Sequence, residues 1–189
     1  LFKYHAACYL THAGIDALKK LKEDHNLKVD QVERIEQFVP NTHFSVCNIA
    51  EPETGLEVKF SMRHTAAMTL ADVDTGSLHS YSDDIAKRPD LIKLRDRVTI
   101  IDKPFNSRMQ SEVVVHLKDK GTVHQFSDAG VPESNLDKQE TKLIRKFNSL
   151  VTPIFGEETS QSILDKCLTL ETLENVADLF NDVTLSNVS

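Results

Sequence analysis

The sequence predicts an α+β fold that is followed by C-terminal α-helices. Up to about residue 126, short stretches of alternating polar and apolar residues are interleaved with stretches of helical periodicity. Gly130, Pro132, Ser134 and Asn135 then form the clearest linker of the chain. Beyond this linker every periodic segment is helical, so a mixed domain followed by helices is the expected order.

The first elements are a helix, a strand and a loop. Apolar residues at three-to-four-residue spacing predict a helix over residues 11–25, and Asn26 is a suitable residue to end it. Alternating side chains predict a strand in the second half of residues 29–39, up to Pro40. The prolines and the glycine of residues 41–55 indicate a loop.

Serine and proline mark the starts of the next helices. Ser61 and Ser82 can each accept a hydrogen bond from a first helical turn, and Pro89 suits a first helical position because it lacks an N–H. We therefore expect helices over residues 62–71, 83–87 and 89–95, and strands over 98–101, 112–117 and 122–126. A short charged turn that ends at Gly121 joins the last two strands and predicts a hairpin.

The linker is followed by three expected helices, over residues 136–151, 157–168 and 170–181. Pro153 and Gly156 are expected to end the first of them, since proline removes a backbone donor and glycine disfavours a helix. Thr169 is a natural N-cap for the last one.

Composition argues against several classes of function. The net charge of -7 and the pI near 5.6 disfavour non-specific nucleic-acid binding, although a few local cations can still bind an anionic small molecule. The three cysteines are far apart, which disfavours a structural zinc site or a disulfide framework and is typical of a reducing, cytoplasmic protein. No apolar run reaches the ~18 residues of a membrane span, and no signal peptide is visible.

The first twelve residues concentrate chemically active side chains. Because the chain begins at Leu1 without a methionine, we interpret it as part of a longer protein that starts just before a site. Lys3 could bind a carboxylate as a point charge; the alternative is an ordinary surface lysine. His5, Cys8 and His12 are spaced to share a helical face, but no carboxylate joins them at a fitting offset. We therefore predict no metal, and we expect polar packing or substrate contact for His12.

A second active stretch covers residues 59–64, at a predicted strand-to-helix junction. Backbone N–H groups at the start of a helix favour anions, and Arg63 could hold a carboxylate in bidentate fashion. His64 could transfer a proton near neutral pH. The alternative is a capped helix whose first turn is solvated.

The two stretches together resemble the MmgE/PrpD family. The Phe-Lys-x-x-x-x-Cys-x-x-Thr-His of residues 2–12, followed by the Ile-Asp-Ala of residues 15–17, is similar to the start of the family's second domain. Residues 57–61 before an alanine-rich helix resemble it too, and the strand at 97–100 and the hairpin through Gly121 follow in the same order. The resemblance covers nearly the whole chain.

The resemblance implies both a fold and a function. The family includes 2-methylcitrate dehydratase, cis-aconitate decarboxylase and iminodisuccinate epimerase, which share metal-free proton chemistry on small polycarboxylates. Its members pair a large N-terminal helical domain with a smaller α+β lid domain, and they are typically homodimers. The expected fold is therefore a two-layer α/β sandwich lid over residues 1–132. A helical segment over residues 133–189 is expected to pack on the N-terminal helical domain, which this chain lacks.

Site roles are carried over from the family by position. Lys3 matches the active-site lysine that opens the lid domain, and Cys8 and His64 fall where the decarboxylase has a histidine and a tyrosine. These two departures disfavour decarboxylation but do not choose between a dehydratase and an epimerase. From the resemblance we expect a dehydratase-type lyase with Lys3 and His64 as catalytic residues and no cofactor. The residues expected to bind a substrate such as 2-methylcitrate are Cys8, His12, Ser61 and Arg63. The alternatives are an epimerase or decarboxylase of the same family, or a non-catalytic α+β module for ligand binding or dimerisation.

Overall fold

The computed structural model describes residues 1–119 and 121–181, which fall into two compact units. The first unit comprises Leu1 and Lys3–Pro132, and the second continues from Glu133. Residues 182–189 of the predicted helical segment lie outside the described residues. That each part acts as the predicted domain stays a prediction.

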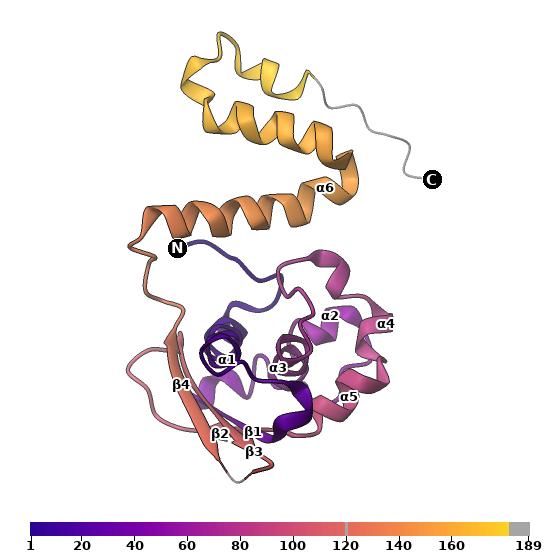
Figure 1. Ribbon diagram of the computed structural model, residues 1–189, viewed down its shortest axis with the longest axis vertical. Coiled ribbons are helices and arrows are strands. Elements are labelled where there is room, and N and C mark those ends of the chain that lie inside the picture. The colour runs from indigo at the N-terminus through magenta and orange to yellow at the C-terminus, as the bar shows by residue number, and fades with distance from the viewer. Residues whose placement is uncertain (120, 182–189) are drawn as a thin grey trace. The chain divides into compact units, whose positions relative to one another are not determined.

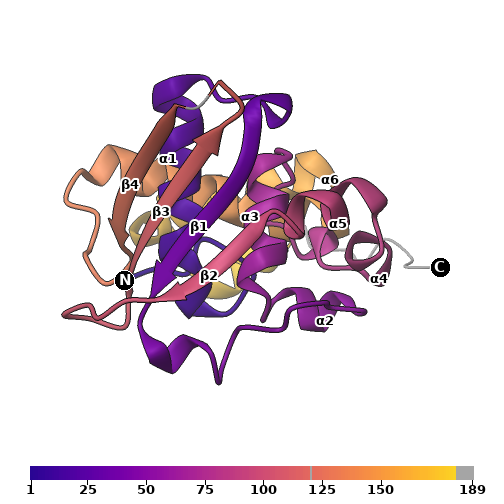
Figure 2. The same ribbon diagram turned by 90° about the horizontal axis from the view of Figure 1, so that it is seen from below.

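A mixed sheet of four strands forms one layer of the described first unit (Figure 2). The strands are β1 (Val32–Val39), β2 (Val98–Asp102), β3 (Gln110–Leu117) and β4 (Thr122–Asp128). In the order β2-β1-β3-β4, β1 and β2 are parallel, whereas β3 is antiparallel to both of its neighbours. The β3–β4 pair is the predicted hairpin, and the sheet with its helices confirms the predicted α+β class.

Two helices, α1 (His12–His25) and α3 (Met62–Leu70), pack on the sheet from the same side (Figures 1 and 2). Along β3 the side chains of Ser111, Val113 and Val115 are buried, and the residues between them are only partly buried. This alternation is what an antiparallel strand shows when one face of its sheet is covered.

Local sequence explains where α1 begins and ends. Its residues Ile15, Leu18 and Leu21 are buried, as the apolar spacing predicts. Asn26 follows the helix in the left-handed region with φ of 48°, and its N–H donates to the carbonyl oxygen of Lys22. Asparagine tolerates this conformation better than most residues, so it ends the helix as predicted.

The connection between β1 and β2 carries α2 (Gly55–Val58), α3, α4 (Asp83–Ala86) and α5 (Pro89–Arg95). The hydroxyl oxygens of Thr54, Ser61 and Ser82 each accept a hydrogen bond from a backbone N–H of the turn that follows. Each bond satisfies one of the backbone donors that a helix start leaves unpaired.

The strand expected just before α3 is not present. Residues 55–58 are helical because Thr54 and Glu57 form a capping box, in which each side chain accepts a bond from the other residue's backbone N–H. Extended pairing in this region is confined to a single bridge between Asn48 and Ser61. The junction at Ser61 therefore joins two helices through a short turn.

In the second unit, α6 (Leu136–Leu168) continues through Pro153, so the predicted stop at this proline is wrong (Figure 1). The helix breaks at Gly156, whose φ of 80° lies outside the helical range. A proline removes one backbone donor, whereas this backbone conformation, which glycine adopts readily, redirects the chain. The buried residues of α6 are Ser160, Ile163 and Leu164.

The single helix expected over residues 170–181 is also wrong. The chain forms two short 3₁₀ segments instead, η5 (Leu170–Thr172) and η6 (Val176–Phe180). The Thr169 hydroxyl donates to the carbonyl oxygen of Asp165 and caps nothing downstream, whereas the Asn175 side chain accepts a bond from the N–H of Ala177. This second cap starts a new turn and interrupts the predicted helix.

Among the described residues, no helix combines the length and the apolar character needed to span a membrane.

Gly55 is the position at which a single methyl group should disrupt the packing of α2. A β-carbon at residue 55 would lie 1.9 Å from the carbonyl oxygen of Tyr81, and backbone atoms cannot move aside cheaply. We expect Gly55→Ala to lower the free energy of unfolding by about 2–3 kcal/mol, measured by urea denaturation. Leu56→Ala is the control because Leu56 is 67% exposed, and it should change stability by about 0.5 kcal/mol or less. Equal effects of the two substitutions would contradict the close approach.

Candidate functional site

The two stretches that the sequence singles out lie side by side. The N–H of Cys8 donates to the carbonyl oxygen of Lys59 at 2.9 Å, and the N–H of Ala6 donates to that of Thr75 at 2.8 Å. Residues 6–8 are thus held by two distant segments just before the chain enters α1. These bonds determine where the side chains before and after residues 6–8 can lie.

His5 connects the chain start to two other segments through its two ring nitrogens. Nε2 lies 3.0 Å from Oδ1 of Asp16, and Nδ1 lies 2.7 Å from Oγ1 of Thr75. Because a carboxylate can only accept, we assign the proton to Nε2, and Nδ1 of the neutral ring then accepts from the Thr75 hydroxyl. The Asp16 side chain is about half exposed, and the hydrogen bond from His5 outweighs the partial desolvation of the carboxyl group and lowers its pKa.

His12 packs against His5 and keeps one ring nitrogen unused. Its ring centroid lies 4.8 Å from that of His5, edge to face, and 4.7 Å from that of Tyr9. Nε2 of His12 is buried and has no hydrogen-bond partner in the described part of the chain. Burial, assisted by the neighbouring His5, lowers the pKa of His12 to about 3, so the ring is neutral at pH 7. His12 can therefore exchange a hydrogen bond with a ligand but does not carry a positive charge.

Lys3 supplies the positive charge near this cluster. Its side chain is exposed and forms no hydrogen bond or ion pair with the residues described. The charge of Lys3 is nevertheless close enough to contribute to the low pKa of His12. Arg63 is half-buried, and its Nε atom has no hydrogen-bond partner within residues 1–119 and 121–181. Among the described residues, the Lys3 ammonium group therefore has no ion-pair partner and the Nε of Arg63 has no hydrogen-bond partner.

His64 lies inside the protein. Its side chain is fully buried, and Nε2 lies 3.2 Å from the carbonyl oxygen of Ile85 at the end of α4. Burial lowers the pKa of His64 to about 4. Ser61 is buried too, and its Oγ accepts a bond from the N–H of His64. The start of α3 is therefore capped, as in the alternative of a capped helix with a solvated first turn, but this first turn is largely buried and not solvated.

The predicted spacing of His5, Cys8 and His12 does not produce a metal site. In the part of the chain that the structure describes, no group of three or more His, Cys, Asp or Glu side chains is placed to hold a metal ion. Both ring nitrogens of His5 are already hydrogen-bonded, and Cys8 packs against the apolar core cluster. The three residues instead take part in separate contacts.

Sequence reasoning missed two members of this cluster as site residues. Asp16 follows His12 by one helical turn, so the i, i+4 spacing on one helix face was a usable indication. Thr75 offered no local indication, because its contact with His5 spans 70 residues of sequence.

The family model of the MmgE/PrpD C-terminal domain matches residues 5–170. No curated protein matches the chain. The matched range includes His5, Cys8, His12 and the whole stretch around His64, and it begins two residues after Lys3.

The buried histidines should make the protein less stable in acid. The unfolded chain takes up a proton at His64 below pH 6.5, whereas the folded chain does so only near pH 4, so stability is lost as the pH falls between these values. The free energy of unfolding of the unsubstituted chain should fall between pH 7 and pH 5, and we expect His64→Gln to make this fall smaller by about 2 kcal/mol. Denaturation at both pH values measures the difference.

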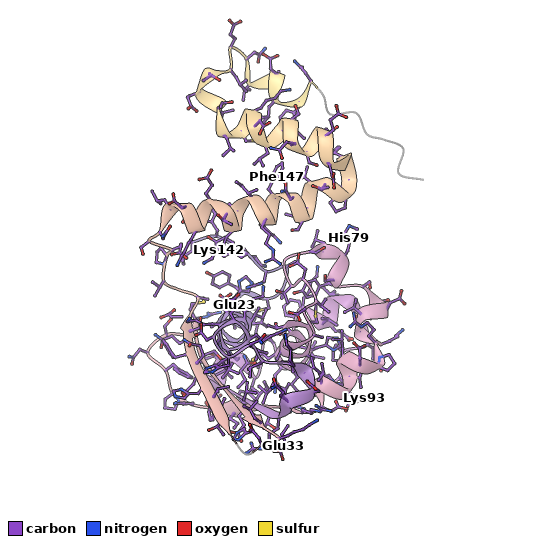
Figure 3. The ribbon with its side chains drawn as sticks, in the orientation of Figure 1. Glu23, Glu33, His79, Lys93, Lys142 and Phe147 are labelled. Atoms are coloured by element: carbon purple, nitrogen blue, oxygen red, sulfur yellow. The ribbon has the colours of Figure 1, made fainter. Side chains whose placement is uncertain are left out.

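His79 provides the matched control for this measurement, because it is exposed on the first unit (Figure 3). His79→Gln should leave the pH dependence of stability unchanged. A pH dependence for His64→Gln that equals that of the unsubstituted chain would contradict the burial of a neutral His64.

Proposed function

This chain belongs to the MmgE/PrpD family, whose C-terminal domain it matches, and on that premise we propose that it forms part of a dehydratase-type lyase for small polycarboxylates. A substrate such as 2-methylcitrate represents the class. The observation that carries the proposal is the exposed Lys3 beside a buried, neutral His12 whose Nε2 has no partner among the described residues.

Charge supports a polycarboxylate ligand. The protein carries a net charge of -7, so an anionic substrate needs local cations to bind. Lys3 is an exposed ammonium group without an internal ion pair in the described residues, and Arg63 has an unpartnered Nε. A lysine acts as a point charge and a guanidinium group as a planar, bidentate donor, so each of the two side chains suits one carboxylate of a ligand.

Polar groups support the proton chemistry. Removal of a proton next to a carboxylate builds enolate-like charge on that carboxylate, and a positioned donor at the oxygen contributes roughly 3–4 kcal/mol. In this proposal Lys3 provides that stabilisation. In this proposal the neutral His12 accepts a hydrogen bond from a hydroxyl group of the substrate or donates one to a carboxylate, which requires that the substrate reach its buried Nε2. Cys8 lies four residues earlier on the same segment.

A catalytic role for His64 stays a prediction. The side chain is fully buried and contacts the backbone of Ile85, so a direct role in catalysis requires substrate to reach the interior of the unit. Ser61 caps α3 through its Oγ, and substrate binding through that atom requires the same access.

We also propose that the chain functions beside other helices. Among its larger apolar residues, Leu136, Ile154, Leu168 and Phe180 of the second unit are each about half exposed or more. Such surfaces favour contact with further apolar surface, which agrees with the proposed helical domain and with the proposed homodimer. The proposal involves no metal ion and no cofactor.

The proposal is tested with a protein that carries this chain together with the helical domain. Purified protein is incubated with 2-methylcitrate, citrate and cis-aconitate, and the products are followed by proton NMR. Loss of water from 2-methylcitrate supports the lyase; release of carbon dioxide or inversion of a stereocentre supports the related family activities instead. Binding without turnover supports a non-catalytic module. The 189-residue chain alone is expected to be inactive, because the helical domain is proposed to supply part of the site.

Lys3→Ala should lower kcat/KM in that protein at least about tenfold, which corresponds to ~1.4 kcal/mol of transition-state stabilisation. Lys93→Ala is the matched control, since Lys93 is exposed on α5 in the first unit (Figure 3), and it should leave kcat/KM unchanged. If both variants behave alike, Lys3 is not part of the site.

A further inference from the structure

His12 buries a ring nitrogen, Nε2, inside the first unit. The residue is 3% exposed, and this nitrogen has no hydrogen-bond partner among residues 1–119 and 121–181. A buried polar atom without a partner costs free energy, so a ring that is able to turn about its side-chain bonds turns toward a partner. The surroundings of His12 must therefore keep the ring in its present orientation.

The rings of His5 and Tyr9 both pack against His12. The centroid of the His5 ring lies 4.8 Å from that of His12, and the interplanar angle of 79° means that the two rings meet edge to face. The centroid of the Tyr9 ring lies 4.7 Å from that of His12, with an interplanar angle of 34°. In a closely packed interior, rings in such contact obstruct each other's rotation. The orientation of His12 therefore depends on how firmly His5 and Tyr9 are held.

Hydrogen bonds to other segments hold both of these rings. Nε2 of His5 lies 3.0 Å from Oδ1 of Asp16 in α1, and Nδ1 of His5 lies 2.7 Å from Oγ1 of Thr75. The Tyr9 hydroxyl donates to the carbonyl oxygen of Ala129 at 2.7 Å. Because both ring nitrogens of His5 are engaged, its ring cannot turn without breaking a hydrogen bond.

Thr75, one of the two anchors of His5, is itself fixed through its backbone. Its carbonyl oxygen accepts a bond of 2.8 Å from the N–H of Ala6 and one of 3.0 Å from the hydroxyl of Tyr81. The whole residue is buried. Loss of the hydroxyl group alone would leave these backbone bonds in place, so the contact of Thr75 with His5 can be removed separately.

We propose that His5 is a positioning residue that, anchored by Thr75 and Asp16, holds the His12 ring so that its Nε2 is available to a polycarboxylate substrate. The use of Nε2 by the substrate rests on the proposed function, whereas the hold of His5 on the ring does not. A group that is already oriented loses little further freedom when a ligand binds, so this arrangement favours both binding and catalysis. An exception to the pairing of buried polar atoms is expected at a functional site.

The first test observes the His12 ring directly, in the 189-residue chain with isotopically labelled histidine nitrogens at pH 7. A neutral ring in one orientation keeps one tautomer and gives two well-separated nitrogen NMR signals, whereas a ring that turns exchanges tautomers and gives averaged signals. The His12→Phe chain identifies the two signals, because it lacks them. We expect Thr75→Val to move the two His12 signals toward each other, since the loss of one anchor loosens His5.

Thr69→Val is the matched control for Thr75→Val. Thr69 is a buried threonine of α3, and its hydroxyl donates to the carbonyl oxygen of Thr65 within the same helix. The control therefore removes a buried hydroxyl group of the same size that does not anchor His5, and it should leave the His12 signals unchanged.

Asp16→Asn weakens the other anchor of His5 and serves as a second variant where Thr75→Val fails to fold. Its control is Glu23→Gln, which removes an exposed carboxylate from the same helix (Figure 3). Circular dichroism checks that each variant is folded. The proposal is overturned if the His12 signals of the folded anchor variants equal those of their controls.

The second test measures the consequence for the substrate, in the protein that also carries the helical domain. Thr75→Val should lower kcat/KM for 2-methylcitrate about tenfold. In a protein that already carries His12→Phe it should lower kcat/KM no further, because a positioning residue acts only through the residue that it holds. Equal losses in both backgrounds indicate a merely structural role and overturn the proposal, as does an unchanged kcat/KM. If the unsubstituted protein does not act on 2-methylcitrate, the proposed function fails, and the His12 signals alone then decide whether His5 holds the ring.

Discussion

The burial of α1 against the sheet and against its neighbour α3 is the constraint on which the first unit depends. Within this helix, Gly14 lies so close to Gln37 of β1 that a β-carbon at residue 14 would meet the Gln37 amide nitrogen at 2.1 Å. Gln37 is itself 2% exposed, so its side chain has little room to move. The absence of a side chain at residue 14 therefore lets helix and strand approach, and Ile15 and Leu18 of the same helix reach the core.

The position of α1 in turn organises the candidate site. Because the helix begins at His12, that ring is placed beside His5, and Asp16 one turn later reaches the same His5 ring. The packing that excludes water from His12 also keeps it neutral and leaves its Nε2 without a described partner. The proposed polycarboxylate site thus depends on the segment that backbone bonds hold just before α1.

Most of the elements could be predicted because their causes are local. Ser61, Ser82 and Asn26 act on backbone groups within four residues, so their effects can be read from neighbouring positions. The errors at Pro153 and over residues 170–181 are of the opposite kind. There several local preferences compete. The non-helical backbone conformation of Gly156 and the cap that Asn175 forms interrupt a regular helix.

The candidate site could be predicted only in part. Lys3, His12 and Cys8 belong to a stretch whose side chains are visible as a group in the sequence. Thr75 could not be associated with that stretch, since its partner His5 is 70 positions away. Hydrogen bonds of this reach exist only after the chain has folded.

The amino-acid sequence alone was sufficient for the α+β class, the order of the elements in the first unit and the family, because periodicity, caps and motif order depend on neighbouring residues. Tertiary packing alone settled which polar residues meet water. It left Lys3 exposed and buried His12 and His64 as neutral rings. The physical reason is that burial, and with it a pKa, depends on atoms contributed by distant segments, which no local pattern specifies.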